Sequence, residues 1–481
     1  MSIAKNYIYN VIYQIVTLVI PIITIPYVSR VLGSSGVGTN AFTNSIVQYF
    51  ILFGTIGISL YGNRTVAYVR DNKDELSRTF WGIFVLKIIT TGSAFAAFLV
   101  FLFVVDSYQT IFLIQSIYIL AAAVDISWLY MGLEDFKKTV IRNLFVRVIG
   151  VICIFLFVKT STDLWIYVFI LAFSQFLGHL SLWVYLPKTI SRVKLKWIDI
   201  KKHLKPSISL FIPQIAIQIY LVLNKTMLGI FSNTNEVGYF DNADKVVKIV
   251  LSIVTAMGVV MLPRVANTFA KGQINRVKEY LYHSFDFASY LSIPLMFGLA
   301  GIALEFAPWF FGPEFSKSGL LICVISPIVL FIAWSNVIGQ QYLMPIGNMR
   351  VYTYSVVMGA IINLILNFLL IGPYQSTGTA IATVIAEFCV IVVQLYFVRH
   401  EFKIKKLLRS LWKYLTAGFF MFLFIRYIGN SLGVGYKTTA VQVITGAPIY
   451  FILLFIMKSE LNRKLFGVGL KLIRKVIRLS S

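Results

Sequence analysis

The chain has 481 residues, of which 58% are hydrophobic and 13% are charged, whereas an ordinary soluble domain carries about 25% charged residues. This composition argues against a soluble enzyme and predicts a membrane protein with several spans. Lys and Arg number 43 against 19 Asp and Glu, a net charge of +24. In a membrane protein such an excess indicates which loops face the cytoplasm rather than binding to nucleic acid.

The sequence contains about fourteen apolar stretches of the roughly 20 residues that a helix needs to cross a bilayer. They lie near residues 7–28, 41–60, 80–105, 110–131, 141–158, 164–186, 207–230, 240–262, 285–306, 318–343, 351–371, 377–398, 411–428 and 438–457. The first follows Lys5 and has no small-residue cleavage site, so we expect a retained helix rather than a signal peptide. The sequence therefore predicts an all-α polytopic membrane protein with about 14 transmembrane helices.

The basic residues are unevenly divided between the two sides of the membrane. When successive loops are assigned to alternate sides, most basic residues fall on the side that holds both termini. The opposite side holds only Arg30, Lys159, Lys317 and Lys437. Because basic loops stay cytoplasmic, we expect both termini in the cytoplasm and an even number of spans.

A short repeat divides the chain into two halves. Residues 32–38 (LGSSGVG) after the first span recur as Leu228-Gly229 and Glu236-Val237-Gly238 after the seventh. Parallel repeats are typical of transporters whose halves move around a central cavity, although Gly-rich helix ends also recur by chance. The predicted parts are an N-terminal lobe (1–186), a basic cytoplasmic linker (187–206), a C-terminal lobe (207–400), two further helices (401–460) and a basic amphipathic tail (461–481). The tail either lies on an anionic inner leaflet or supplies only topogenic charge.

Three ionisable residues lie at one depth in the N-terminal lobe. Lys87 in span 3, Asp125 in span 4 and Arg147 in span 5 are each about 10 Å from the predicted cytoplasmic boundary, at 1.5 Å per residue. A charge within a span is costly unless it faces a cavity or a partner. One interpretation is a basic inner vestibule in which Asp125 tunes a cation. The other is a structural ion pair between helices. In that case one of the two cations has no acidic partner at this depth.

Two further residues within spans are candidates for function. Lys225 in span 7 is cationic, although its side chain could instead extend to the outer surface. Glu387 lies near the middle of span 12 among apolar neighbours. It either exchanges a proton during transport, because desolvation favours its neutral form, or hydrogen-bonds as a neutral acid to Asn363 and Asn367 in span 11.

Sequence motifs of enzymes and metal sites are absent. No GxxxxGK[ST] phosphate loop and no HExxH motif occurs, so neither ATP hydrolysis nor a zinc site is indicated. The three cysteines, Cys153, Cys323 and Cys389, show no metal-ligand spacing. We therefore expect no cofactor, no metal and no catalytic residue.

Several stretches together resemble the polysaccharide transporter family of the multidrug/oligosaccharidyl-lipid/polysaccharide exporter superfamily, and the resemblance covers nearly the whole chain. The most specific stretch is residues 125–137 (DISWLYMGLEDFK), which is followed by Arg142 and Asn143. The others are residues 57–64 (GISLYGNR), 237–240 (VGYF), 340–345 (QQYLMP) and 378–383 (GTAIAT).

The resemblance implies a two-lobed flippase that moves a polyprenyl-diphosphate-linked oligosaccharide to the outer leaflet of a bacterial cytoplasmic membrane. Its partners are then the lipid-linked oligosaccharide, membrane lipids and other membrane proteins of polysaccharide assembly, with no nucleic acid. The residues expected to stabilise the diphosphate are Lys87, Arg147, Arg30, Arg64 and Lys225. Asp125 and Glu387 are candidates for charge tuning or for coupling to H+ or Na+.

Two rival functions stay open at this point. A cation-coupled multidrug exporter of the same superfamily has the same helix count, but it needs acidic residues to attract cationic cargo. Spans 1 and 7 contain no acid, and span 7 carries Lys225. A membrane enzyme such as a polysaccharide polymerase would be expected to present catalytic groups in a sizeable outer loop, and no predicted outer loop is long enough.

Overall fold

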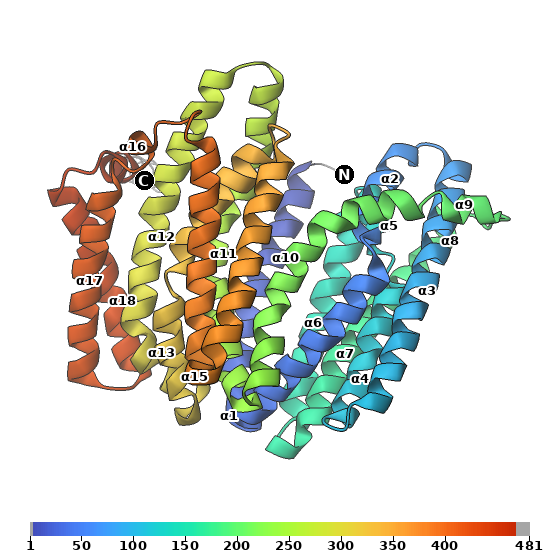
Figure 1. Cartoon of the computed structure of the whole chain (residues 1–481), viewed down its shortest axis with the longest axis horizontal. Coiled ribbons are helices and arrows are strands. Elements are labelled where there is room, and N and C mark those ends of the chain that lie inside the picture. Colours follow the sequence, from blue (N-terminus) through green and yellow to red (C-terminus); the bar gives the residue numbers. More distant parts are fainter. Residues whose placement is uncertain (1–2, 468–481) are drawn as a thin grey trace, which may run out of the picture. The chain divides into compact units, whose positions relative to one another are not determined.

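The computed structural model describes the backbone of residues 3–467, and the side chains of that range except 3–18, 136–141 and several positions between 212 and 260. Every regular element in this range is helical (Figure 1), as predicted. The chain forms two compact units, Met1–Asp241 (unit 1) and Asn242–Ser481 (unit 2). Unit 1 extends past the predicted linker because α10 packs against α1 and α2. The division into two repeat-related lobes stays a prediction.

Unit 1 consists of helices packed around α1. Its elements are α1 (Ile3–Thr55), α2 (Ile58–Val69), α3 (Lys73–Val104), α4 (Gln109–Val124), α5 (Ser127–Gly132), α6 (Phe136–Phe157), α7 (Leu164–Ser181), α8 (Leu186–Thr189), α9 (Trp197–Lys201), α10 (Leu204–Phe231) and the start of α11 (Thr234–Ala270), with 3-10 turns at Ser161–Asp163 and Leu182–Tyr185. Gly33, with φ 66° and ψ −179°, divides α1 into two parts, a conformation that glycine adopts without strain. The helices α3, α4, α6 and α7 all contact α1 (Figure 1).

The observed helices agree with the predicted spans, each of which falls on one helix or on two or three consecutive helical pieces. Within residues 3–467, nine helices are by themselves long and apolar enough to cross a membrane, and a bent pair, Pro313–Ile325 with Ile328–Leu343, makes a tenth. Two of the nine, Val19–Val69 and Met349–Val398, contain a break between two predicted spans. The protein is therefore an all-α integral membrane protein.

The fourth predicted span is interrupted at Asp125, between α4 and α5. The Asp125 carboxylate accepts hydrogen bonds from the backbone N–H of Ser127 at 2.9 Å and from its hydroxyl at 3.0 Å. The interruption frees two backbone carbonyls. Trp183 Nε1 donates to Val124 O at 2.8 Å, and Lys87 Nζ donates to Asp125 O at 2.6 Å. A broken helix at membrane depth is stable only when its freed backbone groups find such partners.

Large buried side chains hold α5 against its neighbours. Trp128 and Tyr130 are fully buried, and Trp128 stacks on Phe80 of α3 with ring centroids 5.5 Å apart. Tyr130 Oη donates to Leu182 O at 3.0 Å. Both residues belong to the most specific stretch of the family resemblance. In this chain, Trp128 and Tyr130 of that stretch therefore pack α5 against the neighbouring helices.

The helices α1 and α11 cross at two glycines. A Cβ atom on Gly38 would lie 1.7 Å from Thr234 O, and one on Gly238 would lie 2.2 Å from Ser34 O. No larger residue fits at either position without moving a backbone. Beside the glycines, the hydroxyls of Ser35 and Thr234 lie 3.3 Å apart. The charge pattern predicts that this crossing faces the outer side of the membrane.

Unit 2 contains the second set of long helices. Its elements after α11 are α12 (Ile274–Phe311), α13 (Ser316–Ile325), α14 (Ile328–Ser335), α15 (Met349–Val398), α16 (Ile404–Leu407), α17 (Leu411–Leu432) and α18 (Tyr436–Ile456), with a 3-10 turn at Pro313–Phe315 and a π-helical turn at Asn336–Leu343. Gln375, with φ 51°, divides α15. Most of the predicted amphipathic tail lies outside the described residues.

A buried ion pair attaches the two C-terminal helices to α12. Arg426 Nη1 of α17 lies 2.9 Å and 2.8 Å from the two carboxylate oxygens of Glu305 on α12. Gln442 of α18 donates to the same carboxylate at 3.3 Å. Glu305 is 6% exposed. This ion pair was not predicted from the sequence.

Candidate anion-binding site

Lys87 and Asp125, two of the predicted site residues, contact each other in unit 1. Lys87 is 1% exposed, and its Nζ lies 4.0 Å from Asp125 Oδ2 in addition to its bond to the Asp125 carbonyl. A buried charge is stable only with such partners. Lys87 therefore supports the interruption of the fourth span.

His179 of α7 binds Asp125 and lies beside Arg142 of α6. Its Nδ1 lies 2.8 Å from Asp125 Oδ1 and 3.5 Å from Nη1 of Arg142. A carboxylate only accepts hydrogen bonds, so His179 carries a proton on Nδ1 when it binds Asp125, and that nitrogen then cannot accept from Arg142. Arg142 is held instead by Asn143, whose Oδ1 accepts from its Nε at 3.0 Å.

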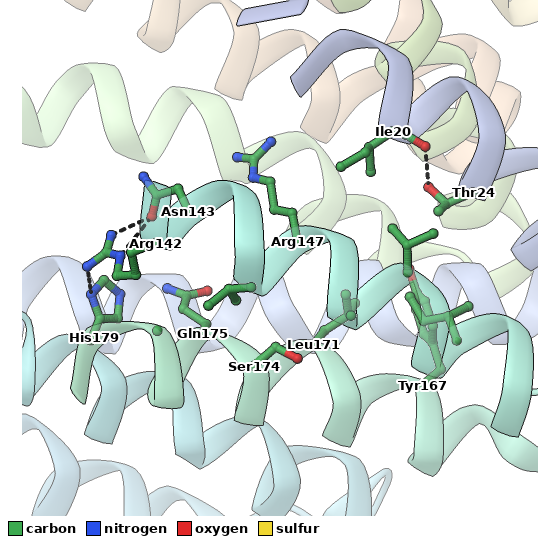
Figure 2. A pocket seen from close by; sticks show the side chains of 15 residues that line it. Ile20, Thr24, Arg142, Asn143, Arg147, Tyr167, Leu171, Ser174, Gln175 and His179 are labelled. Carbon is green, nitrogen blue, oxygen red and sulfur yellow. Dashed lines mark hydrogen bonds between the residues drawn. The ribbon is translucent and has the colours of Figure 1, made fainter. Parts of the chain in front are cut away.

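A cavity of about 470 Å³ lies beside this network, between α1, α6 and α7. Its size falls within the roughly 300–1,000 Å³ of ordinary ligand sites. Figure 2 shows Arg142 and Arg147 on α6, with Gln175 and His179 on the adjacent α7. No Asp or Glu is among the described residues that line the cavity.

The lining of this cavity suits an anion with several oxygen atoms. The guanidinium groups of Arg142 and Arg147 each offer N–H donors in a planar fork that matches phosphate geometry. Ser174, Gln175 and Asn143 add uncharged hydrogen-bonding groups. Because the cavity lies within membrane-spanning helices, its attraction for an anion is screened less than at a water-exposed surface.

The other predicted cations lie elsewhere in unit 1. Arg30 is exposed on α1. Arg64 is exposed on α2, and its Nε donates to Tyr68 Oη at 3.1 Å. Lys225 of α10 forms an ion pair of 2.5 Å with Asp241 of α11. Among the predicted cations, Arg147 is thus the one that lines this cavity.

Glu387 lies in unit 2, where it is 9% exposed on the second part of α15. Its predicted partners, Asn363 and Asn367, are fully buried on the first part of that helix. The Asn367 amide donates to Asn363 Oδ1 at 3.0 Å. The role of Glu387 in coupling stays a prediction.

Two residues of the site, Arg142 and His179, were not among the predicted site residues. Arg142 was noted only as part of the family resemblance. His179 belongs to no sequence motif, because the four histidines of the chain are far apart. A usable signal was present, because His179 is the one histidine inside a predicted span, where an ionisable residue is a functional candidate. Among the described residues, no group of three or more His, Cys, Asp or Glu could hold a metal ion.

Long apolar helices around a basic cavity define a polytopic membrane protein with a polar interior. The chain belongs to the family described as polysaccharide biosynthesis protein, whose profile matches residues 3–269. A candidate O-antigen transporter of Escherichia coli (strain K12) is 24% identical over 409 residues, which are 83% of this chain and 98% of that protein.

Two solved structures share the fold. The lipid II flippase MurJ in an inward closed conformation matches with a TM-score of 0.75 and 16% identity, over 95% of this chain and 99% of that one. An inward-facing multidrug resistance MATE family transporter of the MOP superfamily matches with a TM-score of 0.61 and 10% identity, over 82% and 99%. Since a flippase and a drug transporter both have this fold, the site must decide between them.

Proposed function

We propose that this protein is a flippase that moves a polyprenyl-diphosphate-linked oligosaccharide, the repeat unit of a cell-surface polysaccharide, from the cytoplasmic to the outer leaflet by alternating access. The observation that carries the proposal is the cavity lined by Arg142 and Arg147 within a membrane-spanning unit. The diphosphate is the charged part of such a lipid, and guanidinium groups bind phosphate oxygens through charge-assisted hydrogen bonds. The names of the relatives, an O-antigen transporter and a lipid II flippase, agree with this cargo. Flipping requires no covalent step, so the protein is not an enzyme.

The alternative is a cation-coupled multidrug exporter, which shares the fold. A cationic drug in the cavity would meet two guanidinium groups and, among the described lining residues, no carboxylate. Like charges at such close range repel strongly where water is scarce. The cavity therefore favours an anionic cargo.

We further propose a location in the bacterial cytoplasmic membrane with both termini in the cytoplasm, on the strength of the basic loops. The partners are membrane lipids and other membrane proteins of polysaccharide assembly. Residues 1–186 and 207–400 are proposed to be the two lobes, joined by the linker 187–206.

Asp125 and Glu387 are proposed to serve charge tuning and ion coupling. Asp125 contacts His179, which lies beside Arg142 at the cavity. Glu387, buried in unit 2, is the candidate for coupling to H+ or Na+. The measurement is transport by Glu387→Gln in liposomes with and without a pH gradient. If that variant responds to the gradient as the wild type does, Glu387 is not the proton carrier.

The proposed function is tested by reconstituting the full chain in liposomes and measuring movement of a polyprenyl-diphosphate oligosaccharide and of a cationic dye. We expect the lipid-linked sugar alone to move. The Arg142→Gln/Arg147→Gln variant should lose about tenfold to a hundredfold in affinity for this lipid, the effect of removing charge-assisted hydrogen bonds. Arg276, exposed on α12, provides the control variant Arg276→Gln, which should transport normally. Movement of the dye alone would identify a drug exporter.

A further inference from the structure

A second cavity, of about 240 Å³, lies in unit 1 between α1, α2 and α10. Its polar lining consists of Gln48 and Thr55 from α1, Ser59 from α2 and Gln218 from α10. No charged residue is among the described residues around it. The lining of this cavity is therefore polar but uncharged, unlike that of the cavity lined by Arg142 and Arg147.

Three of the four polar side chains of this cavity are available to a ligand, whereas the Thr55 hydroxyl donates to Ile51 O at 2.9 Å and can only accept. In the part of the chain that the structure describes, the side chains of Ser59 and Gln218 make no hydrogen bond to another residue, and both are exposed. Gln48 Nε2 lies 3.5 Å from Asn44 Oδ1, at the limit of a hydrogen bond. Each primary amide offers two N–H donors and a carbonyl acceptor, and each hydroxyl both donates and accepts. The lining can therefore pair with a ligand that carries several hydroxyl groups.

An aromatic ring completes the cavity. Phe211 of α10 lines it and is only 6% exposed. Its ring packs edge-to-face on Phe53, with centroids 6.1 Å apart. Its backbone lies close to the start of α2, because a Cβ atom on Gly57 would lie 3.2 Å from Phe211 Cα. A fixed ring beside uncharged hydrogen-bonding groups suits a ligand with one apolar face and hydroxyl groups at its edge, which describes a pyranose ring.

We propose that this cavity is a saccharide subsite, which binds one sugar ring of the lipid-linked oligosaccharide. The inference rests on the proposed function and extends it, because it separates recognition of the sugar from recognition of the diphosphate. The volume is just below the roughly 300–1,000 Å³ of ordinary ligand pockets, so the subsite takes a single ring rather than a whole oligosaccharide. A site built to hydrogen-bond hydroxyl groups discriminates strongly against a ligand that lacks them.

The first test is protection of a thiol placed in the cavity. Ser59→Cys is introduced into the full chain after Cys153, Cys323 and Cys389 have been changed to Ala, and labelling by a water-soluble maleimide is timed in detergent. The probes are polyprenyl diphosphate carrying one hexose, N-acetylhexosamine or deoxyhexose, and sugarless polyprenyl diphosphate. At a concentration of ten times Kd, at least one sugar-bearing lipid should slow labelling about tenfold, whereas the sugarless lipid should not. Equal protection by both kinds of lipid, or protection by neither, would overturn the proposal.

The second test measures selectivity. We expect Gln48→Leu/Gln218→Leu to reduce the ratio of affinities for sugar-bearing and sugarless lipid about tenfold, the effect of two lost hydrogen bonds. The matched control is Gln109→Leu, the same change at an exposed position of α4, which should leave the ratio unchanged. Arg142→Gln/Arg147→Gln should weaken both lipids equally and preserve the ratio.

The outcomes separate the two proposals. An unchanged ratio in Gln48→Leu/Gln218→Leu, or equal weakening of both lipids by it, would overturn the saccharide subsite while leaving the flippase proposal intact. A wild-type chain that binds neither lipid but binds a cationic dye would overturn the proposed function, and the subsite with it.

Discussion

The imidazole Nδ1 of His179 lies 2.8 Å from Oδ1 of Asp125. Through this contact Asp125 gains a partner on α7, in addition to Lys87 on α3 and Ser127 at the start of α5. A carboxylate that joins several helices within a membrane is costly to remove, because its partners are left without it. Asp125 is therefore a structural residue first, and it contacts the cavity lining through His179.

Removal of either member of the Lys87 and Asp125 pair should destabilise unit 1. We expect Lys87→Met and Asp125→Asn each to cost about 3–5 kcal/mol, because each removes the opposite charge from a buried ionised group. The double variant should cost less than the sum, as for residues in contact. The measurement is the apparent melting temperature of the detergent-solubilised protein. A Lys87→Met variant that is as stable as the wild type but does not transport would instead support the basic vestibule.

The crossing of α1 and α11 should part during transport, if the protein alternates its access as proposed. The hydroxyls of Ser35 and Thr234 lie 3.3 Å apart, so the double variant Ser35→Cys/Thr234→Cys should form a disulfide under oxidising conditions. We expect oxidation to stop transport and a reductant to restore it, with each single variant as the control. Transport that continues after complete crosslinking would show that the crossing stays closed.

A larger residue at Gly38 should separate α1 from α11 at the crossing. The Cβ atom introduced by Gly38→Ala would lie 1.7 Å from Thr234 O, so the backbones must separate. Overpacking of this kind costs about 1–3 kcal/mol or more. In the Ser35→Cys/Thr234→Cys background we expect Gly38→Ala to lower the yield of the disulfide, measured by gel shift. An undiminished yield would contradict the close approach.

His203, in the predicted linker, should make stability depend on pH. Tyr61 Oη and His203 Nδ1 lie 2.7 Å apart, and the His203 side chain is almost fully buried. Burial, helped by the charge of Lys202 and opposed by Asp199, lowers the pKa of His203 to about 4. Since the unfolded value is about 6.5, the stabilising contribution is complete above pH 6.5 and is lost as the pH falls from 6.5 to 4.

The measurement for His203 is the melting temperature in detergent at pH 7.5 and pH 5. We expect His203→Asn, which retains an acceptor for Tyr61, to lose less stability than the wild type over this interval. The control is His400→Asn, at an exposed position, which should behave as the wild type. Equal pH dependence in His203→Asn and the wild type would show that another group is responsible.

The ion pair between Arg426 and Glu305 should govern how firmly α17 and α18 are attached. We expect Arg426→Met to cost about 3–5 kcal/mol, because it leaves the Glu305 carboxylate buried without its cation. Arg426→Met/Glu305→Gln should recover part of the loss. The exposed pair of Arg409 and Glu460 supplies the control Arg409→Met, which should cost at most about 1 kcal/mol. The comparison uses melting temperature and the rate of proteolysis between α15 and α17.

Helix positions were predictable because apolar length alone decides where a chain crosses a bilayer. The breaks at Gly33 and Gln375 fall between predicted spans. The interruption at Asp125 was not predicted, because the apolar stretch 110–131 continues through it. Only packing shows that Lys87 and Trp183 supply the missing partners of the backbone.

The site was predictable in part. Counting residues along the spans predicts a depth for each residue, and this singled out Lys87, Asp125 and Arg147. Depth does not give the direction of a side chain around its helix axis, and that direction separates the buried Lys87 from Arg147 on the cavity wall. His179 is distant from Asp125 in the sequence, so no spacing rule could join them.

The contact between α1 and α11 is reciprocal. Position 38 meets residue 234, position 238 meets residue 34, and the predicted repeat aligns Gly38 with Gly238. Such an exchange of partners is the signature of an isologous interface, the kind that two identical subunits form across a two-fold axis. Here one polypeptide supplies both surfaces. At each glycine the obstacle to a larger residue is a backbone carbonyl, that of Thr234 or of Ser34, so no substitution at one glycine can make room for a side chain at the other.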